Sequence, residues 1–141
     1  MTISARNQLP VTVKSIQSGA VNDVIELSLS SGETLVAVIT ADSTKKLTLS
    51  EGKSAIAVFK APSVMLATDS DLILSARNQL KATVTKITHG AVNAEVVVQT
   101  AGGVELVAMI TEESAKRLAL DEKASVTAII KASHILVGVK K

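Results

Sequence analysis

The sequence predicts an all-β protein built from two tandem five-stranded antiparallel barrels, each with one short helix. Three observations support this prediction. Short runs of alternating apolar and polar residues recur along the chain, and they are rich in the β-branched residues that half-buried strands favour. Gly, Ser, Asn and Asp cluster between these runs, as expected for tight turns. The second half of the chain also repeats the first.

The internal repeat is the strongest of these signals. Residues 4–70, laid without gaps on residues 75–141, match at 28 positions. A fixed period marks a duplicated structural unit, so we expect one domain over 1–69, a second over 70–141 and a linker at 68–71. The retained blocks include SARNQL at 4–9 and 75–80, GAVN at 19–22 and 90–93, VAVIT at 36–40 matching VAMIT at 107–111, and Lys-Ala at 60–61 and 131–132.

Local patterns predict the elements of each half. Thr40 is expected to cap a short helix over 43–47, because its hydroxyl can accept from an amide three residues on and Asp42 favours the positive helix end. An irregularity is expected at Lys14-Ser15 in the first strand. The predicted strands are 9–16, 24–29, 34–39, 54–60 and 63–67, then 82–87, 95–100, 104–110, 125–131 and 134–139, with a second helical turn at 111–118.

Five short strands and one helical turn in about 70 residues fit a small closed or nearly closed barrel similar to an OB-fold. An SH3-like barrel fits almost the same pattern and stays an alternative. A domain of about 70 residues is close to the lower limit for a single core without disulfides or metal. Neighbouring chains are therefore expected to contribute further burial.

Composition narrows the function classes. There is no cysteine, so disulfides, zinc–thiolate sites and catalytic thiols are excluded. The net charge is only +2 and Phe59 is the single aromatic residue, which argues against nucleic-acid binding by base stacking. The N-terminal residues lack a secretory signal pattern, and no run is long and apolar enough to span a membrane. We expect a soluble cytoplasmic protein with no nucleic-acid or membrane partner.

The repeat argues against an enzyme. His89 and His134 have no histidine counterparts, because Ser18 and Ser63 stand at the matching positions. Glu51 is the one acidic residue retained identically, as Glu122, and both lie in expected turns. Paired carboxylates, a nucleophile elbow and a Walker loop are all missing from the sequence. We therefore expect no catalytic residues.

The retained polar residues instead indicate anion binding. Arginine offers a planar fork of donors, lysine a mobile ammonium and serine a hydroxyl, and backbone N–H groups near Ala61 or Ser63 can join them. Such a set has many donors and few acceptors, which suits a tetrahedral oxyanion. The structural alternative is that the cations are solvated strand ends while Asn and Gln satisfy turn backbone. The retained set is Ser4, Arg6, Asn7, Gln8 and Lys60, with Ser75, Arg77, Asn78, Gln79 and Lys131.

The GAVN blocks allow two interpretations. Structurally, Gly19 permits a positive φ and Asn22 satisfies a turn. Functionally, consecutive backbone N–H groups in such a turn can form an anion nest. The second anion site would then comprise Gly19, Ala20, Val21 and Asn22, with Gly90, Ala91, Val92 and Asn93.

The order and spacing of these blocks resemble the molbindin family, the Mop-type molybdate-binding domains. The resemblance spans both halves and implies an OB-like barrel per repeat, a homotrimer, and molybdate or tungstate held non-covalently between barrels of neighbouring chains. It implies intracellular molybdenum storage, or alternatively a molybdate-sensing module that docks on a regulator or transporter. The implied ligand residues are Ser4, Ala5, Arg6, Lys60, Ala61, Ser63, Ser75, Ala76, Arg77, Lys131, Ala132 and Ser133.

The second half departs from the family pattern after its lysine. Ser133 replaces Pro62 and His134 replaces Ser63. Backbone contacts are expected to be less affected by this change than side-chain contacts.

Overall fold

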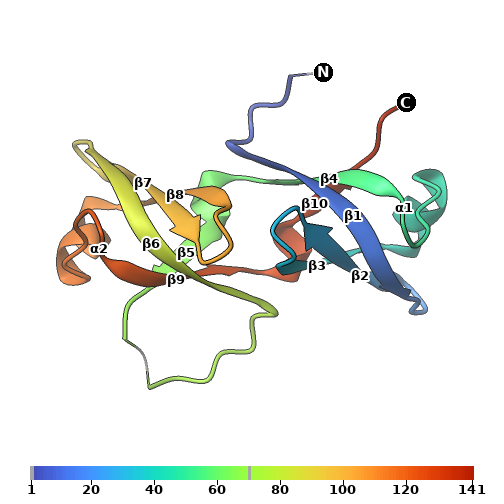
Figure 1. The fold of residues 1–141 in the computed structure, drawn as a ribbon, viewed down its shortest axis with the longest axis horizontal. Helices are drawn as coiled ribbons and strands as arrows, with labels where there is room; N and C mark the ends of the chain where they lie inside the picture. Colours follow the sequence, from blue (N-terminus) through green and yellow to red (C-terminus); the bar gives the residue numbers. More distant parts are fainter. Residues whose placement is uncertain (1, 70) are drawn as a thin grey trace. The chain divides into compact units, whose positions relative to one another are not determined.

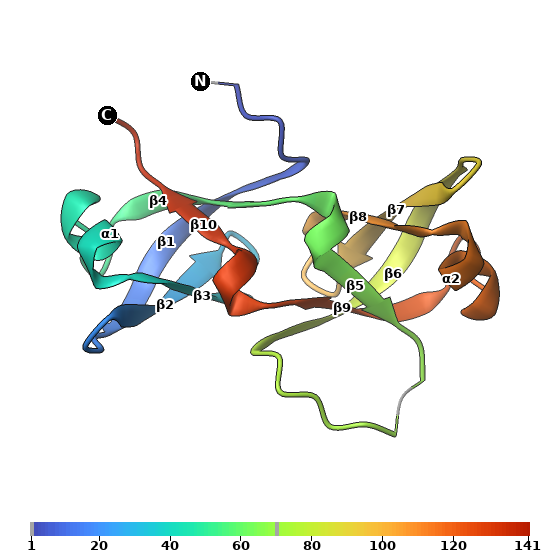
Figure 2. The same ribbon diagram turned by 180° about the vertical axis from the view of Figure 1, so that it is seen from behind.

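The computed structural model describes residues 2–69 and 71–141 and divides into two compact units. One unit contains Met1–Phe59 and Lys131–Lys141, and the other contains Lys60–Ile130. Each unit holds a five-stranded antiparallel sheet and one short α-helix. Figures 1 and 2 show these elements from opposite sides. The predicted all-β class with two OB-like barrels is confirmed.

The strand order is the same in both units. In the first it is β10-β4-β1-β2-β3, and in the second it is β5-β9-β6-β7-β8. The first unit contains β1 (Asn7–Gln17), β2 (Asn22–Leu29), β3 (Thr34–Thr40), β4 (Ser54–Phe59) and β10 (Leu136–Gly138). The second contains β5 (Val64–Ala67), β6 (Asn78–His89), β7 (Asn93–Thr100), β8 (Glu105–Thr111) and β9 (Ser125–Ile130).

Alternation along each strand builds the two cores. In β1, Val11 and Val13 are buried while the residues between them are exposed. The expected irregularity is confirmed, since the β1–β2 register shifts between Val13 and Ser15, as it does at Val84/Lys86 in the second unit. Phe59 is 1% exposed at the end of β4, so the one aromatic ring is a core residue.

The last strand of each repeat pairs within the other repeat's sheet. β5 pairs with β9, and β10 pairs with β4 (Figure 1). The compact units therefore divide the chain differently from the repeat, which predicts a boundary near residue 69. Local alternation predicts that a strand exists, but not which sheet receives it.

The strand ends beside the retained lysines differ from the prediction because a 3-10 turn follows each lysine. The turns η1 (Ala61–Ser63) and η2 (Ala132–His134) replace strand geometry there. β4 consequently ends at Phe59 rather than Lys60, and β10 begins at Leu136 rather than His134. η1 packs on β8 and η2 packs on β3, which covers the open side of each sheet.

The helices are α1 (Ala41–Lys46) and α2 (Glu112–Arg117). The predicted cap at Thr40 is confirmed, because its hydroxyl oxygen accepts from the Ser43 amide at 3.1 Å. The helix starts at residue 41 rather than 43, immediately after its cap. Within the described ranges, neither of these helices nor any other has the length and apolar character that crossing a bilayer requires.

Lys123 provides a stability test of the duplicated fold. It adopts φ 74°, where its counterpart Gly52 has φ 87°, and both amides donate to the equivalent β1 or β6 carbonyl. A lysine in the left-handed region is strained, whereas glycine is not. We expect Lys123→Gly to raise the free energy of unfolding by up to about 1 kcal/mol, measured by urea denaturation. The reverse change, Gly52→Lys, should lower it; an unchanged or lower stability in Lys123→Gly would contradict this explanation.

Candidate functional site

The arginine and lysine pairs of the retained polar set, Arg6 with Arg77 and Lys60 with Lys131, lie at the ends of paired strands. The first pair of the β1–β4 ladder is Asn7↔Phe59, so Arg6 comes directly before this pair and Lys60 directly after it. In the second unit the pair Asn78↔Ile130 is bordered in sequence by Arg77 and Lys131 in the same way. In an antiparallel pair the start of one strand lies beside the end of the other. The arginine before one strand and the lysine after the other are therefore both at the same end of that pair.

Retained glutamines shape the loops that carry Ser4 and Arg6. The Gln8 side-chain amide donates to the carbonyl oxygens of Ile3 and Ala5, at 3.0 Å each. These bonds hold the backbone on both sides of Ser4. The structural interpretation of Gln8 is therefore correct, and it also serves the site because the same bonds position the donor residues.

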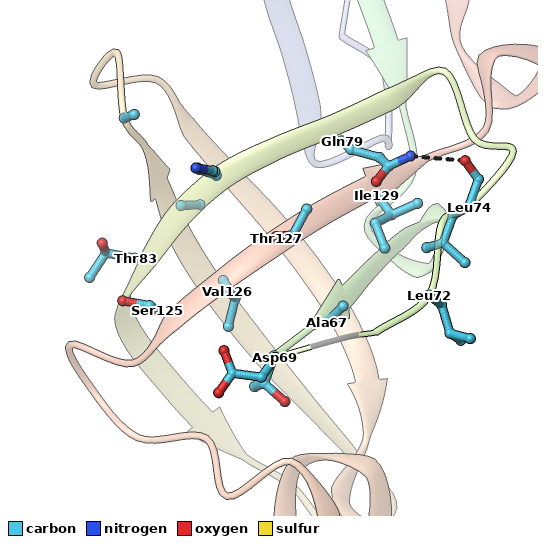
Figure 3. A pocket seen from close by; sticks show the side chains of 14 residues that line it. Ala67, Asp69, Leu72, Leu74, Gln79, Thr83, Ser125, Val126, Thr127 and Ile129 are labelled. Carbon is cyan, nitrogen blue, oxygen red and sulfur yellow. Dashed lines mark hydrogen bonds between the residues drawn. The ribbon is translucent and has the colours of Figure 1, made fainter.

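The second unit repeats this arrangement. The Gln79 amide donates to the Leu74 oxygen at 3.3 Å and to the Ala76 oxygen at 2.9 Å, and Figure 3 shows the first of these bonds. Asn7 and Asn78 begin the strands, and each is only 2% exposed. Together the buried asparagine and the bonding glutamine fix the conformation before each strand.

The candidate donors are accessible to a ligand. Ser4 and Arg6 are exposed, as are Ser75 and Arg77. Lys60 and Lys131 are also exposed, while the alanines that follow them are buried. The structure therefore presents serine, arginine and lysine side chains at solvent-facing strand ends, with the adjoining backbone anchored in the fold.

The backbone amide of Ser63 has a hydrogen-bond partner within its own turn. It donates to the Lys60 oxygen at 2.9 Å inside η1, and the His134 amide donates to the Lys131 oxygen at 3.0 Å inside η2. Of the backbone N–H groups near Ala61 or Ser63 that the sequence suggests as donors, the Ser63 N–H is thus already bonded inside the 3-10 turn. The Ser63 hydroxyl and the Ala61 N–H keep their predicted roles as hypotheses.

The GAVN turns need glycine for a different reason from the one predicted. Positive φ angles occur at Gly32, Gly52 and Gly103 but not at Gly19 or Gly90. A Cβ on Gly19 would lie 2.3 Å from the Asn22 oxygen, and one on Gly90 would lie 2.6 Å from the Asn93 oxygen. Close backbone approach, rather than a left-handed conformation, therefore excludes a side chain.

A carboxylate holds the glycine amide of the first turn. The Gly19 N–H donates to Asp23 Oδ1 at 3.1 Å, and Asp23 is 4% exposed. Hydrogen bonds from the Thr44 hydroxyl and then from the Gly19 amide lower the pKa of Asp23 below its ordinary value, and nearby Lys45 acts in the same direction. The carboxylate is therefore ionised at neutral pH.

In the second turn, Glu112 is the carboxylate that accepts from the glycine amide. The Gly90 N–H donates to Glu112 Oε2 at 2.8 Å, and His89 Nδ1 lies 2.8 Å from Glu112 Oε1. The hydrogen bond to His89 is the main cause of the lowered pKa of Glu112, with the Gly90 amide adding to it. Ala94 stands at the position of Asp23, so the anchoring carboxylate has moved from the strand to the helix start.

Sequence reasoning missed this exchange of carboxylates. The signal was present, because Asp23 becomes Ala94 while Ala41 becomes Glu112 in the repeat. One position loses its carboxylate where the other gains one, which indicates that a carboxylate at either position can perform the same structural role. These carboxylates disfavour anion binding at the glycines, because the Gly19 and Gly90 amides already donate to negatively charged groups.

A hollow on the second unit does not match the chemistry of an oxyanion site. It occupies about 490 Å³ over β6 and β9, beside Asp69, Leu72 and Leu74 (Figure 3). Lys81 is its one basic side chain and Asp69 opposes it with a carboxylate. The strand ends, with their retained cations, remain the candidate site. Among the described residues no group of three His, Asp or Glu side chains gathers that could hold a metal ion.

Comparison with known proteins agrees with the duplication. The family model described as TOBE domain matches residues 3–66 and again residues 74–137. The chain belongs to the TOBE domain family. Its two TOBE domains match the repeat found in the sequence, and the resemblance to Mop-type domains is confirmed by the relatives.

Several relatives of this TOBE pair carry names that refer to molybdenum. The chain is 39% identical to the molybdenum-pterin-binding protein MopA of Rhodobacter capsulatus over 98% of this chain and 52% of that protein. It is 36% identical to the molybdenum transport protein ModE of Azotobacter vinelandii over 99% of this chain and 52% of that protein. The chain thus spans about half the length of these curated relatives.

A solved structure matches the TOBE pair over its whole length. It is the cytoplasmic molybdate-binding protein ModG with molybdate bound, at 47% identity and a TM-score of 0.96. The match covers 99% of this chain and 100% of that one.

Proposed function

We propose that this TOBE pair binds molybdate, and tungstate as a competitor, in the cytoplasm for molybdenum storage or homeostasis. The observation that carries the proposal is the retained set of serine, arginine and lysine at the strand ends of both units. A dianion that leaves water must meet cations and many hydrogen bonds, and this set supplies both. The ModG structure with molybdate bound supports the choice of oxyanion, and the name of MopA refers to molybdenum.

The ligand residues we propose are the twelve that the family resemblance implies, with one change. Ser63 contributes its hydroxyl and not its amide, because η1 uses that N–H. Arg6 and Arg77 supply the planar donor forks, and the lysines supply charge. Binding is non-covalent, and no residue is assigned a catalytic role.

We propose further that the anions lie between chains of a homotrimer. Three exposed apolar positions are retained in both repeats, and such side chains gain stability when a partner chain covers them. The first copies, Val21, Met65 and Ile3, are 72%, 48% and 38% exposed, and their counterparts Val92, Leu136 and Leu74 are 71%, 64% and 37% exposed. Sedimentation equilibrium should give three chains per particle; a monomer at high concentration would remove this part of the proposal.

The second anion site at the GAVN turns is a weaker part of the proposal. The carboxylates of Asp23 and Glu112 accept from the glycine amides, and negative charge there opposes an anion. We therefore propose that an anion at these turns uses the remaining three residues of each block and binds more weakly than at the strand ends.

The proposed function predicts molybdenum uptake and stabilisation. Purified protein incubated with molybdate and then desalted should retain molybdenum in elemental analysis. A ligand at 100 times its Kd stabilises a protein by about 2.7 kcal/mol, so the midpoint of thermal unfolding should rise with molybdate. Sulfate has the same charge but is smaller, and at equal concentration it should neither raise the midpoint comparably nor displace molybdate. Protein that retains no molybdenum and shows no shift would refute the function.

An alternative function is a molybdate-sensing module that docks on a regulator or transporter. The observation that favours it is the match of this chain to about half of ModE, a protein named for molybdenum transport. A pull-down with and without molybdate separates the two functions, because a sensing module should capture a partner in only one of these conditions.

A further inference from the structure

The exchange of last strands also exchanges the turns that precede them. In the first unit, Val58 of β4 pairs with Gln8 on one side and with Leu136 on the other. β1 and β10 therefore start at the same end of β4. Arg6 precedes β1 and η2 precedes β10, so the Arg6 loop and the turn at residues 132–134 lie at one end of the first unit's sheet.

The second unit has the reciprocal arrangement. Ile130 of β9 pairs with Asn78 on one side and with Val64 on the other. The Arg77 loop and the turn at residues 61–63 consequently lie at one end of that sheet. We name these two groups of residues the Arg6 end (4–6 with 132–134) and the Arg77 end (75–77 with 61–63).

The two ends differ in their donors. At the Arg77 end the turn contains Pro62, which has no N–H, and the hydroxyl of Ser63. At the Arg6 end it contains Ser133, which has an N–H, and the imidazole of His134. An imidazole carries at least one N–H donor in either protonation state. Both turns contain one serine hydroxyl, on Ser133 at the Arg6 end and on Ser63 at the Arg77 end. The Arg6 end is thus richer by one backbone donor and one ring donor.

The surroundings of His134 leave its ring available to a ligand. His134 is exposed, and β3, on which η2 packs, has no ionisable side chain over Thr34–Thr40. Lys46 lies with Leu136 and Val137 around a small hollow at the start of β10. The charged side chains named near His134 are the cations Arg6 and Lys46, and both attract an oxyanion.

Resting on the proposed function, we propose that the chain has two unequal classes of oxyanion site, and that His134 strengthens the site built on Arg6. From the repeat alone, His134 would be expected to act with Arg77, because both residues belong to the second repeat. His134 acts as a specificity-determining donor, assisted by the Ser133 amide. The class at the Arg77 end, with proline and serine in its turn, is the weaker.

The first test is titration calorimetry of the full chain with molybdate. We expect two classes of strand-end site, both tighter than any binding at the GAVN turns, and we expect His134→Ser to weaken the tightest class roughly tenfold, as loss of a hydrogen bond to a charged group does. Ser63→His should strengthen the weaker class, and His89→Ser, which removes the other histidine, should change neither. Wild-type protein with a single class of site that His134→Ser leaves unaltered would overturn the inference.

The second test is a pair of double-mutant cycles, which measure coupling between chosen residues. Arg6→Lys and Arg77→Lys keep the charge but lose the bidentate fork, so binding stays measurable. We expect His134→Ser to be non-additive with Arg6→Lys and additive with Arg77→Lys. Coupling to Arg77 instead would overturn the assignment. Wild-type protein that takes up no molybdate would refute the proposed function itself, whereas uptake with equal sites would refute the inference alone.

Discussion

Replacing both Arg6 and Arg77 with alanine is expected to remove nearly all high-affinity molybdate binding while the fold is kept. Each arginine is exposed and precedes a strand, so its removal leaves no cavity. Hydrogen bonds to charged groups contribute about 1.5–3 kcal/mol, which corresponds to roughly 10- to 150-fold in Kd for each site. Titration calorimetry of the double variant should show this loss, and each single variant should lose one class of site.

The matched control is Arg117→Ala. Arg117 lies in the last turn of α2 and borders neither the Asn7↔Phe59 pair nor the Asn78↔Ile130 pair. Its removal changes the net charge by the same amount as either single replacement. Molybdate affinity should stay within about twofold of wild type, because a screened surface charge contributes little. If Arg117→Ala weakens binding as much as Arg6→Ala does, general electrostatic attraction rather than a strand-end site would explain the anion binding.

Replacing Ile135 with alanine is expected to destabilise the first unit selectively. Ile135 is 1% exposed and lies between η2 and β10, in the segment that completes that unit's sheet. Truncation of a buried isoleucine costs about 2–5 kcal/mol. Amide hydrogen exchange should therefore show lost protection in Met1–Phe59, while amides in Lys60–Ile130 keep theirs.

The equivalent position in the other repeat provides the reciprocal control. Val64 is also 1% exposed, and Val64→Ala should lower protection in the second unit instead. Leu136→Ala, next to Ile135 but at a 64% exposed side chain, should change little in the isolated chain. If Ile135→Ala exposed amides of β6 and β9 and spared those of β1 and β4, each repeat would keep its own last strand and the observed exchange would be wrong.

The carboxylate exchange at the GAVN turns illustrates why part of the site could not be predicted. Pattern analysis finds the turn because its four residues are retained, but Asp23 and Glu112 sit at positions that do not correspond. Only the folded structure shows that Asp23 accepts from the Gly19 amide at 3.1 Å and Glu112 from the Gly90 amide at 2.8 Å. The glycine itself is retained for close backbone approach, a property that is invisible without the neighbouring oxygen.

The sequence by itself determined the duplication, the all-β class, the helix caps and the candidate donors. These features follow from local chemistry: side-chain alternation, turn residues and a hydroxyl three residues from an amide all act within a few positions of the chain. Retention of Ser4, Arg6 and Lys60 with their counterparts was readable for the same reason.

Only the tertiary structure decided which turn accompanies which arginine. β5 and β10 each satisfy the same local pattern, and either sheet offers an equivalent open edge beside β4 or β9. Long-range hydrogen bonding selects between these edges, and no short stretch of sequence encodes the choice. As a result His134 lies at the strand end of Arg6 rather than that of Arg77, because pairing is settled by the completed sheet and not by order along the chain.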